Sequence, residues 1–190
     1  MTDSGLYTVE DGWIETYTGV AFYFNKPTVE MIKLADVAHA LAYLCRYNGH
    51  SKHFYSVAEH SYHMAQWLLD EGYSVKTALT GLLHDVAEAY IGDMPRPIKV
   101  TMPNFKAMEA RIEAVAKDRF DIIYPFPNII KQLDSRILND ERGQVMQKSE
   151  HEWGTDSLEP LGVEIQFWDP FYAESQFLSM AYKLGVKDDE

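Results

Sequence analysis

The segment Gly81–Lys99, which reads GLLHDVAEAYIGDMPRPIK, constrains the fold more than any other part of the chain. Apolar residues recur at helical spacing between residues 78 and 91, so we predict a mostly buried helix there. His84 and Asp85 would then lie on a core-facing surface, where ionisable groups are costly unless something pairs with them. A divalent metal ion is a suitable partner for an adjacent His and Asp. Glu88 lies one helical turn after His84 and would face the same pocket.

The end of this segment carries further polar residues in a rigid setting. Gly92 ends the predicted helix, and Asp93 follows on a turn that Pro95 and Pro97 stiffen. An isolated His-Asp pair in a helix is more often structural than functional. Several more polar residues at ordered spacing in the same stretch favour a functional site.

Composition excludes several classes of function. The 190 residues are 46% hydrophobic and 24% charged, which is typical of a soluble domain, and we expect residues 1–190 to form one domain. The formal net charge of −12 argues against a nucleic-acid polymer as partner. A small anion could still bind where local positive charge or a metal overrides the overall field.

The cysteine count and the hydropathy pattern bear on location. A single cysteine allows no internal disulfide, which favours a reducing compartment. No apolar run approaches the roughly 20 residues that a membrane span needs. The first residues lack the basic start of a signal peptide. We therefore expect a cytoplasmic protein that has no membrane partner.

Periodicity predicts an all-α fold, a compact helical bundle with a small β accessory. Aromatic and β-branched residues around Gly19 favour a hairpin within residues 5–24, and alternation over 163–167 predicts a strand that could pair with it. The predicted helices cover residues 36–45 with Asp36 as N-cap, 57–69, 74–91, 104–120, 128–148 and a last helix that begins at Pro170.

Two of these helices have recognisable starts. Ser56 is the expected N-cap of the helix over 57–69, and Glu59, three residues later, would complete a capping box. This helix carries His60 and His63 on one side. Ser74 is the expected N-cap of the helix that carries the opening segment.

Candidate metal ligands lie in three separate segments. They are His60 in the sequence AEHS, the pair His84-Asp85, and Asp134 in the sequence KQLD. Two imidazoles and two carboxylates form a mixed N/O set that suits Mn, Fe, Co, Ni or Zn better than Mg or Ca. Four protein ligands on a six-coordinate ion leave positions for water and a substrate oxygen, as metal-assisted hydrolysis requires.

An H…HD…D pattern spread over three helices resembles that of the HD-domain metal phosphohydrolases. The string H-D-x-x-E-x-x-x-x-D-x-P-x-P-x-K, from His84 to Lys99, is most similar to bacterial 5′-deoxynucleotidases and to phage-type deoxynucleoside triphosphohydrolases, which include enzymes for dATP. Arg46, fourteen residues before His60, falls where these enzymes carry a phosphate-binding arginine. The resemblance covers about residues 35–145, the expected metal-binding core.

The resemblance implies a role for each matching residue. One divalent transition metal ion (Mn, Co, Fe, Ni or Zn) would be bound by His60, His84, Asp85 and Asp134. Glu88 would orient or deprotonate the attacking water. Asp93 would assist at the leaving 5′ oxygen or hold the region of the sugar 3′-hydroxyl. Arg46 and Lys99 would bind phosphate oxygens.

Other positions leave alternatives open. Tyr47 stands where the family commonly has Trp, and the following residues would border the base or sugar, so nucleotide preference is not determined. His63 is either a support for a metal ligand or a substrate contact. Structural alternatives exist for Arg46 as a helix C-terminal cation, for Lys99 as solvated surface and for Asp93 as a turn cap. Other candidates for the last ligand are Asp118, Asp121 and Asp140.

We predict a metal-dependent phosphohydrolase of nucleotides, with deoxynucleotides as the expected class. Water would attack the 5′ phosphate group and release the nucleoside, together with triphosphate from a dNTP such as dATP or with phosphate from a dNMP.

The alternative is a non-catalytic metal- and nucleotide-binding regulatory or scaffold protein. Such proteins usually lose the water-activating carboxylate or the phosphate-binding cation, whereas Glu88, Arg46 and Lys99 are all present here. A di-iron oxygenase site would need more ligands than we find. The resemblance also makes a homo-oligomer conceivable.

Overall fold

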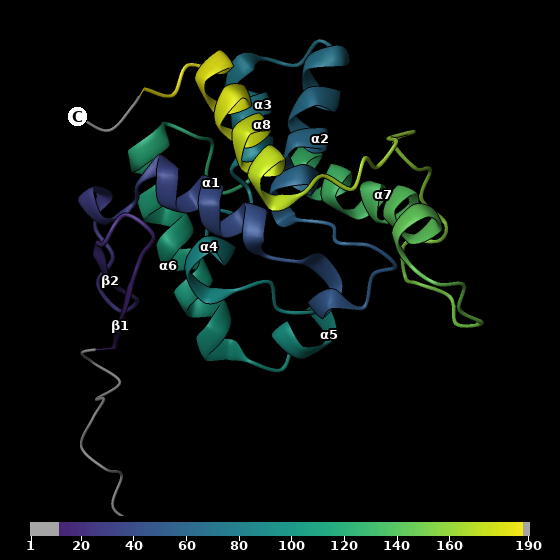
Figure 1. The fold of residues 1–190 in the computed structure, drawn as a ribbon, viewed down its shortest axis with the longest axis horizontal. Helices are drawn as coiled ribbons and strands as arrows, with labels where there is room; N and C mark the ends of the chain where they lie inside the picture. The colour runs from purple at the N-terminus through teal and green to yellow at the C-terminus, as the bar shows by residue number, and fades with distance from the viewer. Residues whose placement is uncertain (1–11, 188–190) are drawn as a thin grey trace, which may run out of the picture.

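Helices dominate the computed structural model, which describes residues 12–187 (Figure 1). Its sheet is an antiparallel hairpin of β1 (Trp13–Glu15) and β2 (Ala21–Tyr23), with Ile14 opposite Phe22. Gly19, in the turn between the strands, has a φ of 81°, which suits a residue without a side chain. The all-α class and the hairpin are thus confirmed, and the part of the predicted hairpin before residue 12 lies outside the described residues.

The helices follow one another along the chain with short connections. They are η1 (Val29–Met31), α1 (Leu34–Tyr43), η2 (Arg46–Gly49), α2 (Val57–Asp70), α3 (Val75–Leu82), α4 (Glu88–Ile91), α5 (Arg96–Lys99), α6 (Pro103–Phe120), α7 (Asn128–Val145) and α8 (Pro170–Lys183). Helix α2 packs against α3 and α8, α8 also packs against α1, and α7 contacts α2 (Figure 1). Within residues 12–187, no helix combines the length and the apolar character needed to cross a membrane.

The apolar faces of these helices meet in one core. Leu41 of α1, Leu68 of α2 and Leu82 of α3 are fully buried there, and burial of a side chain of this size contributes about 1.5–3 kcal/mol. Helices α2 and α3 approach closely at Gly81, where a Cβ atom would lie 2.6 Å from Cδ1 of Leu68. This close approach brings the end of α3 against α2, and with it the residues that follow.

The helix predicted over residues 74–91 is interrupted. Helix α3 ends at Leu82 and α4 begins at Glu88, so His84 and Asp85 lie in a turn rather than on a helix. The amide groups of Val86 and Glu88 bond to carbonyl groups three residues earlier in this turn. The argument that places Glu88 beside His84 by helical periodicity is therefore wrong, although most of the apolar residues of the segment are buried as predicted.

The strand predicted over residues 163–167 is also absent from the described part of the chain. Three successive backbone N–H groups, of Gln166, Phe167 and Trp168, instead donate to the buried carboxylate of Glu59 at 2.7, 3.0 and 2.8 Å. The φ of Phe167 is 55°, which bends the backbone away from strand geometry. The segment is therefore anchored to α2 and not to the hairpin.

The capping predictions have mixed outcomes. Ser56 and Ser74 accept hydrogen bonds from the amide groups three residues later, as N-caps do. Glu59 does not complete the capping box, because its carboxylate binds the 166–168 segment. Asp36 is not an N-cap, since α1 begins at Leu34, and its carboxylate binds the amide and hydroxyl groups of Thr18 in the hairpin turn.

Candidate metal centre

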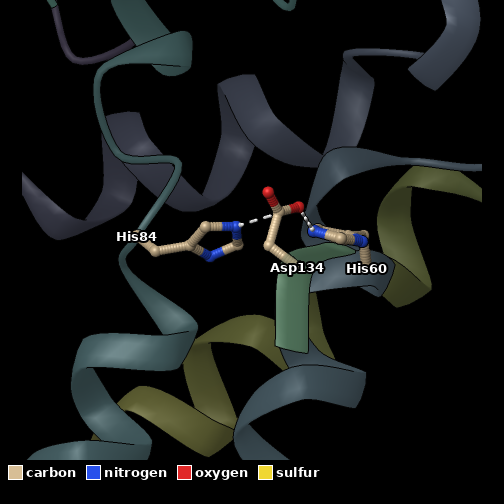
Figure 2. Close-up of side chains that lie close together, drawn as sticks. All are labelled: His60, His84 and Asp134. Carbon is tan, nitrogen blue, oxygen red and sulfur yellow. Dashed lines mark ion pairs between the residues drawn. The ribbon is translucent and has the colours of Figure 1, made fainter. Parts of the chain in front are cut away.

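Three segments that lie far apart in the sequence place ligand atoms at one point. His60 projects from α2, His84 from the turn after α3, and Asp134 from α7, and one ligand atom of each lies within 4.8 Å of the others. Oδ1 of Asp134 is 3.5 Å from Nε2 of His60 and 4.0 Å from Nε2 of His84. Figure 2 shows the Asp134 carboxylate between the two imidazole rings.

The fourth predicted ligand lies at the same point. Oδ1 of Asp85 is 3.1 Å from Nε2 of His84, and its Oδ2 is 3.7 Å from Nε2 of His60. The turn explains how neighbouring residues can face one site, because on a regular helix their side chains would be about 100° apart. The structure therefore brings together His60, His84, Asp85 and Asp134.

Both imidazoles are held with Nε2 directed into this cluster. The Nδ1 atom of His60 is 2.6 Å from Oε1 of Glu141, and Nδ1 of His84 is 2.8 Å from the carbonyl oxygen of Gly81. Each Nδ1 donates in these bonds, because both partners are acceptors, so Nε2 is the nitrogen that each ring directs into the cluster. Both Nε2 atoms are buried, and neither has a hydrogen-bond partner within residues 12–187. Two unpartnered nitrogens beside two carboxylates fit a divalent transition metal ion.

The electrostatics of the cluster favour bound positive charge. Burial raises the pKa of Asp85, but His84, His60 and Arg46 outweigh it and hold this pKa well below its usual range. Burial also opposes ionisation of Asp134, but His60 and His84 lower its pKa. Both aspartates are therefore carboxylates at neutral pH, as metal ligands must be.

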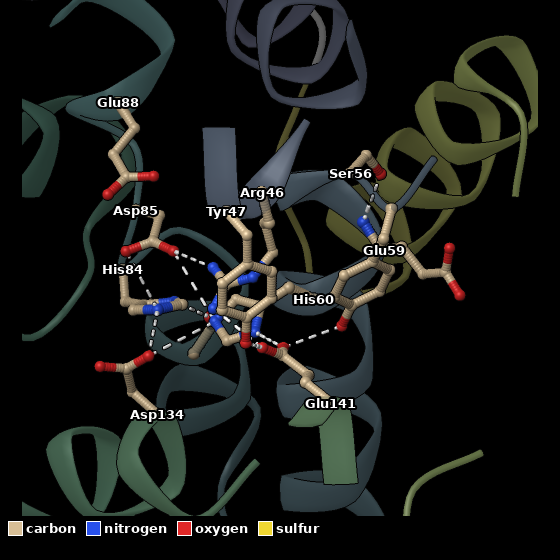
Figure 3. A network of polar contacts seen from close by, with 12 residues as sticks. Arg46, Tyr47, Ser56, Glu59, His60, His84, Asp85, Glu88, Asp134 and Glu141 are labelled. Carbon is tan, nitrogen blue, oxygen red and sulfur yellow. Dashed lines mark hydrogen bonds and ion pairs between the residues drawn. The ribbon is translucent and has the colours of Figure 1, made fainter. Parts of the chain in front are cut away.

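A short loop places Arg46 beside the cluster. The backbone of Arg46 pairs with Tyr55, and η2 continues through Tyr47 and Asn48, whose φ angles are 58° and 52°. Nη2 of the buried Arg46 donates to Oε2 of Glu141 at 3.1 Å, and its Nη1 lies 3.8 Å from Oδ2 of Asp85. The guanidinium thus points into the network of Figure 3.

Glu88 lies next to the cluster at the start of α4. It is 6% exposed, and Figure 3 shows its carboxylate directed toward Asp85. Burial raises its pKa well above the usual range, and the charges of Asp85 and Asp93 add to this effect. Its Oε2 atom is buried and has no hydrogen-bond partner among the described residues. A carboxylate in this state has a strong tendency to take up a proton or a hydrogen bond.

Lys99 and Asp93 both lie close enough to Glu88 to affect its pKa. The ammonium group of Lys99 is 3.5 Å from Oε1 of Glu88 and 2.7 Å from Oε1 of Glu109. Lys99 is therefore not simply solvated. Burial raises the pKa of the half-buried Asp93, while Arg46 lowers it and Asp85 raises it. Asp93 thus lies in the electrostatic field of the cluster.

The two remaining predicted binding residues contact other parts of the chain. The hydroxyl group of Tyr47 donates to Oε2 of Glu141, and its ring centroid is 5.8 Å from that of Trp153. Nε2 of His63 is 3.4 Å from Oε1 of Glu59, and its ring lies 5.6 Å from that of Trp168. A contact of either residue with substrate stays a prediction.

The other aspartates considered for the last ligand position have different partners. Asp140 accepts backbone hydrogen bonds from residues 161–163 at 2.7 to 3.1 Å. Asp121 pairs with Lys76, and the exposed Asp118 lies against Lys117. Asp134 is the one of these four that lies in the cluster.

Glu141 is a central residue that sequence reasoning missed. Its fully buried carboxylate contacts Arg46, Tyr47, Tyr55 and His60. Burial raises its pKa, but Arg46 and His60 outweigh burial and lower the pKa to about 2. Its spacing of seven residues from Asp134 puts both on one face of α7, and this periodicity could have identified it.

Comparisons with known proteins agree with this geometry. Residues 33–150 match the family described as 5′-deoxynucleotidase YfbR-like. The chain is 35% identical over 130 residues to the uncharacterized protein YfdR of Escherichia coli, an alignment that covers 68% of this chain and 70% of YfdR. It is 31% identical over 125 residues to an uncharacterized protein of Rhodobacter capsulatus, with 63% of this chain and 64% of that protein covered.

Proposed function

The chain belongs to the 5′-deoxynucleotidase YfbR-like family of HD-type nucleotide phosphohydrolases, and we propose that it hydrolyses the 5′ phosphate ester of deoxynucleotides. The products would be the nucleoside and either phosphate from a dNMP or triphosphate from a dNTP, dATP included. The proposed metal ligands are His60, His84, Asp85 and Asp134.

One observation carries this proposal. The unpartnered Nε2 atoms of His60 and His84 converge with two carboxylates, and the guanidinium of Arg46 lies 3.8 Å from one of those carboxylates. A metal-binding cluster with an arginine at its edge is suited to a phosphate ester, because both bind non-bridging oxygens. A divalent ion bound there would lower the pKa of water and neutralise charge on a phosphoryl oxygen.

Glu88 is the proposed proton acceptor. Its Oε2 atom is buried without a partner, so it can take a hydrogen bond from the attacking water. Its raised pKa favours acceptance of the proton as the water attacks phosphorus, and bound positive charge nearby would keep the carboxylate ionised until then. We propose that Asp93 then assists at the leaving 5′ oxygen.

Arg46 and Lys99 are the proposed phosphate-binding cations. The Nε atom of Arg46 is buried and has no hydrogen-bond partner in the described part of the chain. The guanidinium therefore keeps a donor for phosphate while Glu141 holds its Nη2. Lys99 already neutralises Glu88 and Glu109 and would turn toward the added charge of a substrate phosphate. Tyr47 and His63 are proposed to line the sugar or base side.

A substrate panel tests the proposal. The purified protein is incubated with each of the four dNMPs and four dNTPs in the presence of Mn²⁺, Co²⁺ or Zn²⁺, and phosphate and triphosphate are measured separately. We expect nucleoside release from at least one deoxynucleotide and none from the Asp134→Asn variant. The ribonucleotides serve as the comparison for sugar preference.

The product decides between the two hydrolytic reactions, because triphosphate is released only when water attacks the α-phosphorus of a dNTP. A protein that binds Mn²⁺ and nucleotide but releases no nucleoside from any substrate would refute the proposal. That result would favour a non-catalytic regulatory or scaffold protein.

A further inference from the structure

We infer that Glu141 is a positioning residue that fixes the metal-binding imidazole of His60 and the phosphate-binding guanidinium of Arg46 relative to each other. The inference rests on the proposed function and deepens it. Figure 3 shows the Glu141 carboxylate below both side chains, at the centre of the dashed contacts.

The two oxygens of Glu141 serve different sides of the site. Oε1 lies 2.6 Å from Nδ1 of His60 and accepts from the Tyr55 hydroxyl at 2.9 Å. Oε2 accepts from Nη2 of Arg46 at 3.1 Å and from the Tyr47 hydroxyl. One oxygen therefore contacts the metal-binding side and the other contacts the phosphate-binding side.

This arrangement leaves Glu141 little freedom to move. A carboxylate offers about four lone-pair positions, and four donors contact this one. The side chain is fully buried, so water cannot replace a donor that moves away. Rotation of the carboxylate would break contacts on both sides together.

Glu141 also determines which nitrogen of His60 faces the cluster. An ionised carboxylate only accepts, so Nδ1 of His60 carries the hydrogen of this bond, and Nε2 faces Asp134 at 3.5 Å. Asp134 lies two turns before Glu141 on α7. The same helix thus provides one proposed ligand and holds another in place.

On its other side, Glu141 holds the loop that carries Arg46. Tyr47 and Asn48 have left-handed backbone conformations, which are unfavourable for residues with side chains and need support from the surrounding structure. The Tyr47 hydroxyl provides such support through Glu141. Arg46, which is 7% exposed, finds in Glu141 the opposite charge that a buried guanidinium requires.

The test compares two carboxylates that are adjacent on α7. Glu141→Gln keeps the size of the side chain, but the amide can accept on only one side, so His60 or Arg46 loses its partner. Asp140→Asn is the matched control, because Asp140 is also buried but binds the backbone of residues 161–163. Thermal unfolding, the Mn²⁺ dissociation constant without substrate, and kcat and KM at saturating Mn²⁺ are measured for both variants.

We expect Glu141→Gln to weaken Mn²⁺ binding by about 10–100-fold, the usual effect of losing a hydrogen-bond partner of a metal ligand, and to raise KM at saturating Mn²⁺. Asp140→Asn should lower the melting temperature and leave both constants unchanged. A folded Glu141→Gln protein with wild-type Mn²⁺ affinity and KM would overturn the inference. Equal losses in both variants would also overturn it, because they would indicate a general structural effect.

A second variant and a measurement that does not depend on turnover complete the test. If Glu141→Gln does not fold, Glu141→Asp keeps the negative charge beside Arg46 but withdraws the carboxylate by one methylene group, and the same constants are measured. The Mn²⁺ dissociation constant needs no turnover. If the wild-type protein hydrolyses no nucleotide, the proposed function fails, whereas the inference on His60 is still tested by Mn²⁺ binding.

Discussion

The hydrogen bonds that hold residues 166–168 against α2 lead to a quantitative prediction for Glu59→Gln. The carboxylate of Glu59 is fully buried. Its Oε1 accepts the backbone amides of Gln166 and Phe167, and its Oε2 accepts that of Trp168. The substitution keeps the size of the side chain, removes the charge and turns one acceptor into a donor.

The expected loss of stability follows from these contacts. Two hydrogen bonds change from a charged to a neutral acceptor, and each weakens by about 1 kcal/mol. The amide of Trp168 would face the new NH₂ group without an acceptor, which costs about 1–3 kcal/mol. The free energy of unfolding should therefore fall by about 3–5 kcal/mol. For a chain of this length the melting temperature falls by about 2–4 °C per kcal/mol, or roughly 6–20 °C in total.

Urea denaturation followed by circular dichroism measures this loss, and Glu164→Gln is the control. Glu164 belongs to the same segment but is exposed, so its variant should stay within about 0.5 kcal/mol of the wild type. Well below the melting temperature, Glu59→Gln should bind Mn²⁺ normally, because Glu59 lies outside the cluster. A loss under about 1 kcal/mol would refute the anchoring role of this carboxylate.

Three predictions concern the site itself. Glu88→Gln should lower kcat by about 100-fold or more, the scale of general-base catalysis, with little change in Mn²⁺ affinity, and a phosphate-release assay that finds wild-type turnover would contradict its role. Arg46→Lys should raise KM by about 10-fold or more, because a lysine cannot replace the guanidinium fork, and steady-state kinetics at saturating Mn²⁺ measure this. Chelation should abolish turnover, and Mn²⁺ restored to 100 times its dissociation constant should stabilise the fold by about 2.7 kcal/mol. The His84→Ala variant should show no such gain in melting temperature.

Much of the fold was predictable because local signals determine it. Helices α2, α6, α7 and α8 lie close to their predicted bounds, since apolar periodicity and capping or proline signals agree at their starts. The convergence of His60, His84, Asp85 and Asp134 was also predictable, because the spacing of these residues resembles a known family pattern. In these places local sequence and tertiary packing favour the same structure.

The errors arise where tertiary contacts override local pattern. The alternation over residues 163–167 is typical of a strand, but the amides there bind Glu59 on α2. The apolar spacing around His84 is typical of a continuous helix, but the chain turns after Leu82, and Nδ1 of His84 binds the carbonyl of Gly81. A propensity argument contains no information about such long-range or site-specific partners.

On both α2 and α7, one carboxylate binds the backbone of a distant segment and the next residue contacts the site. On α2, Glu59 binds the backbone of residues 166–168, and the next residue, His60, faces the cluster. On α7, Asp140 binds the backbone of residues 161–163, and the next residue, Glu141, contacts His60 and Arg46. Neighbouring side chains on a helix are about 100° apart. Each helix can therefore direct one polar side chain toward residues 161–168 and the next toward the site.

This division connects the site to a part of the chain beyond the family match. Residues 33–150 include both anchoring carboxylates, Glu59 and Asp140, whereas the backbone amides that they bind belong to residues 161–168. Without residues 161–168, the buried carboxylates of Glu59 and Asp140 would lose their hydrogen-bond partners. A buried charge without such partners is strongly unfavourable. The 161–168 segment, although it supplies none of the four cluster residues, therefore contributes to the stability of the fold through its contacts with α2 and α7.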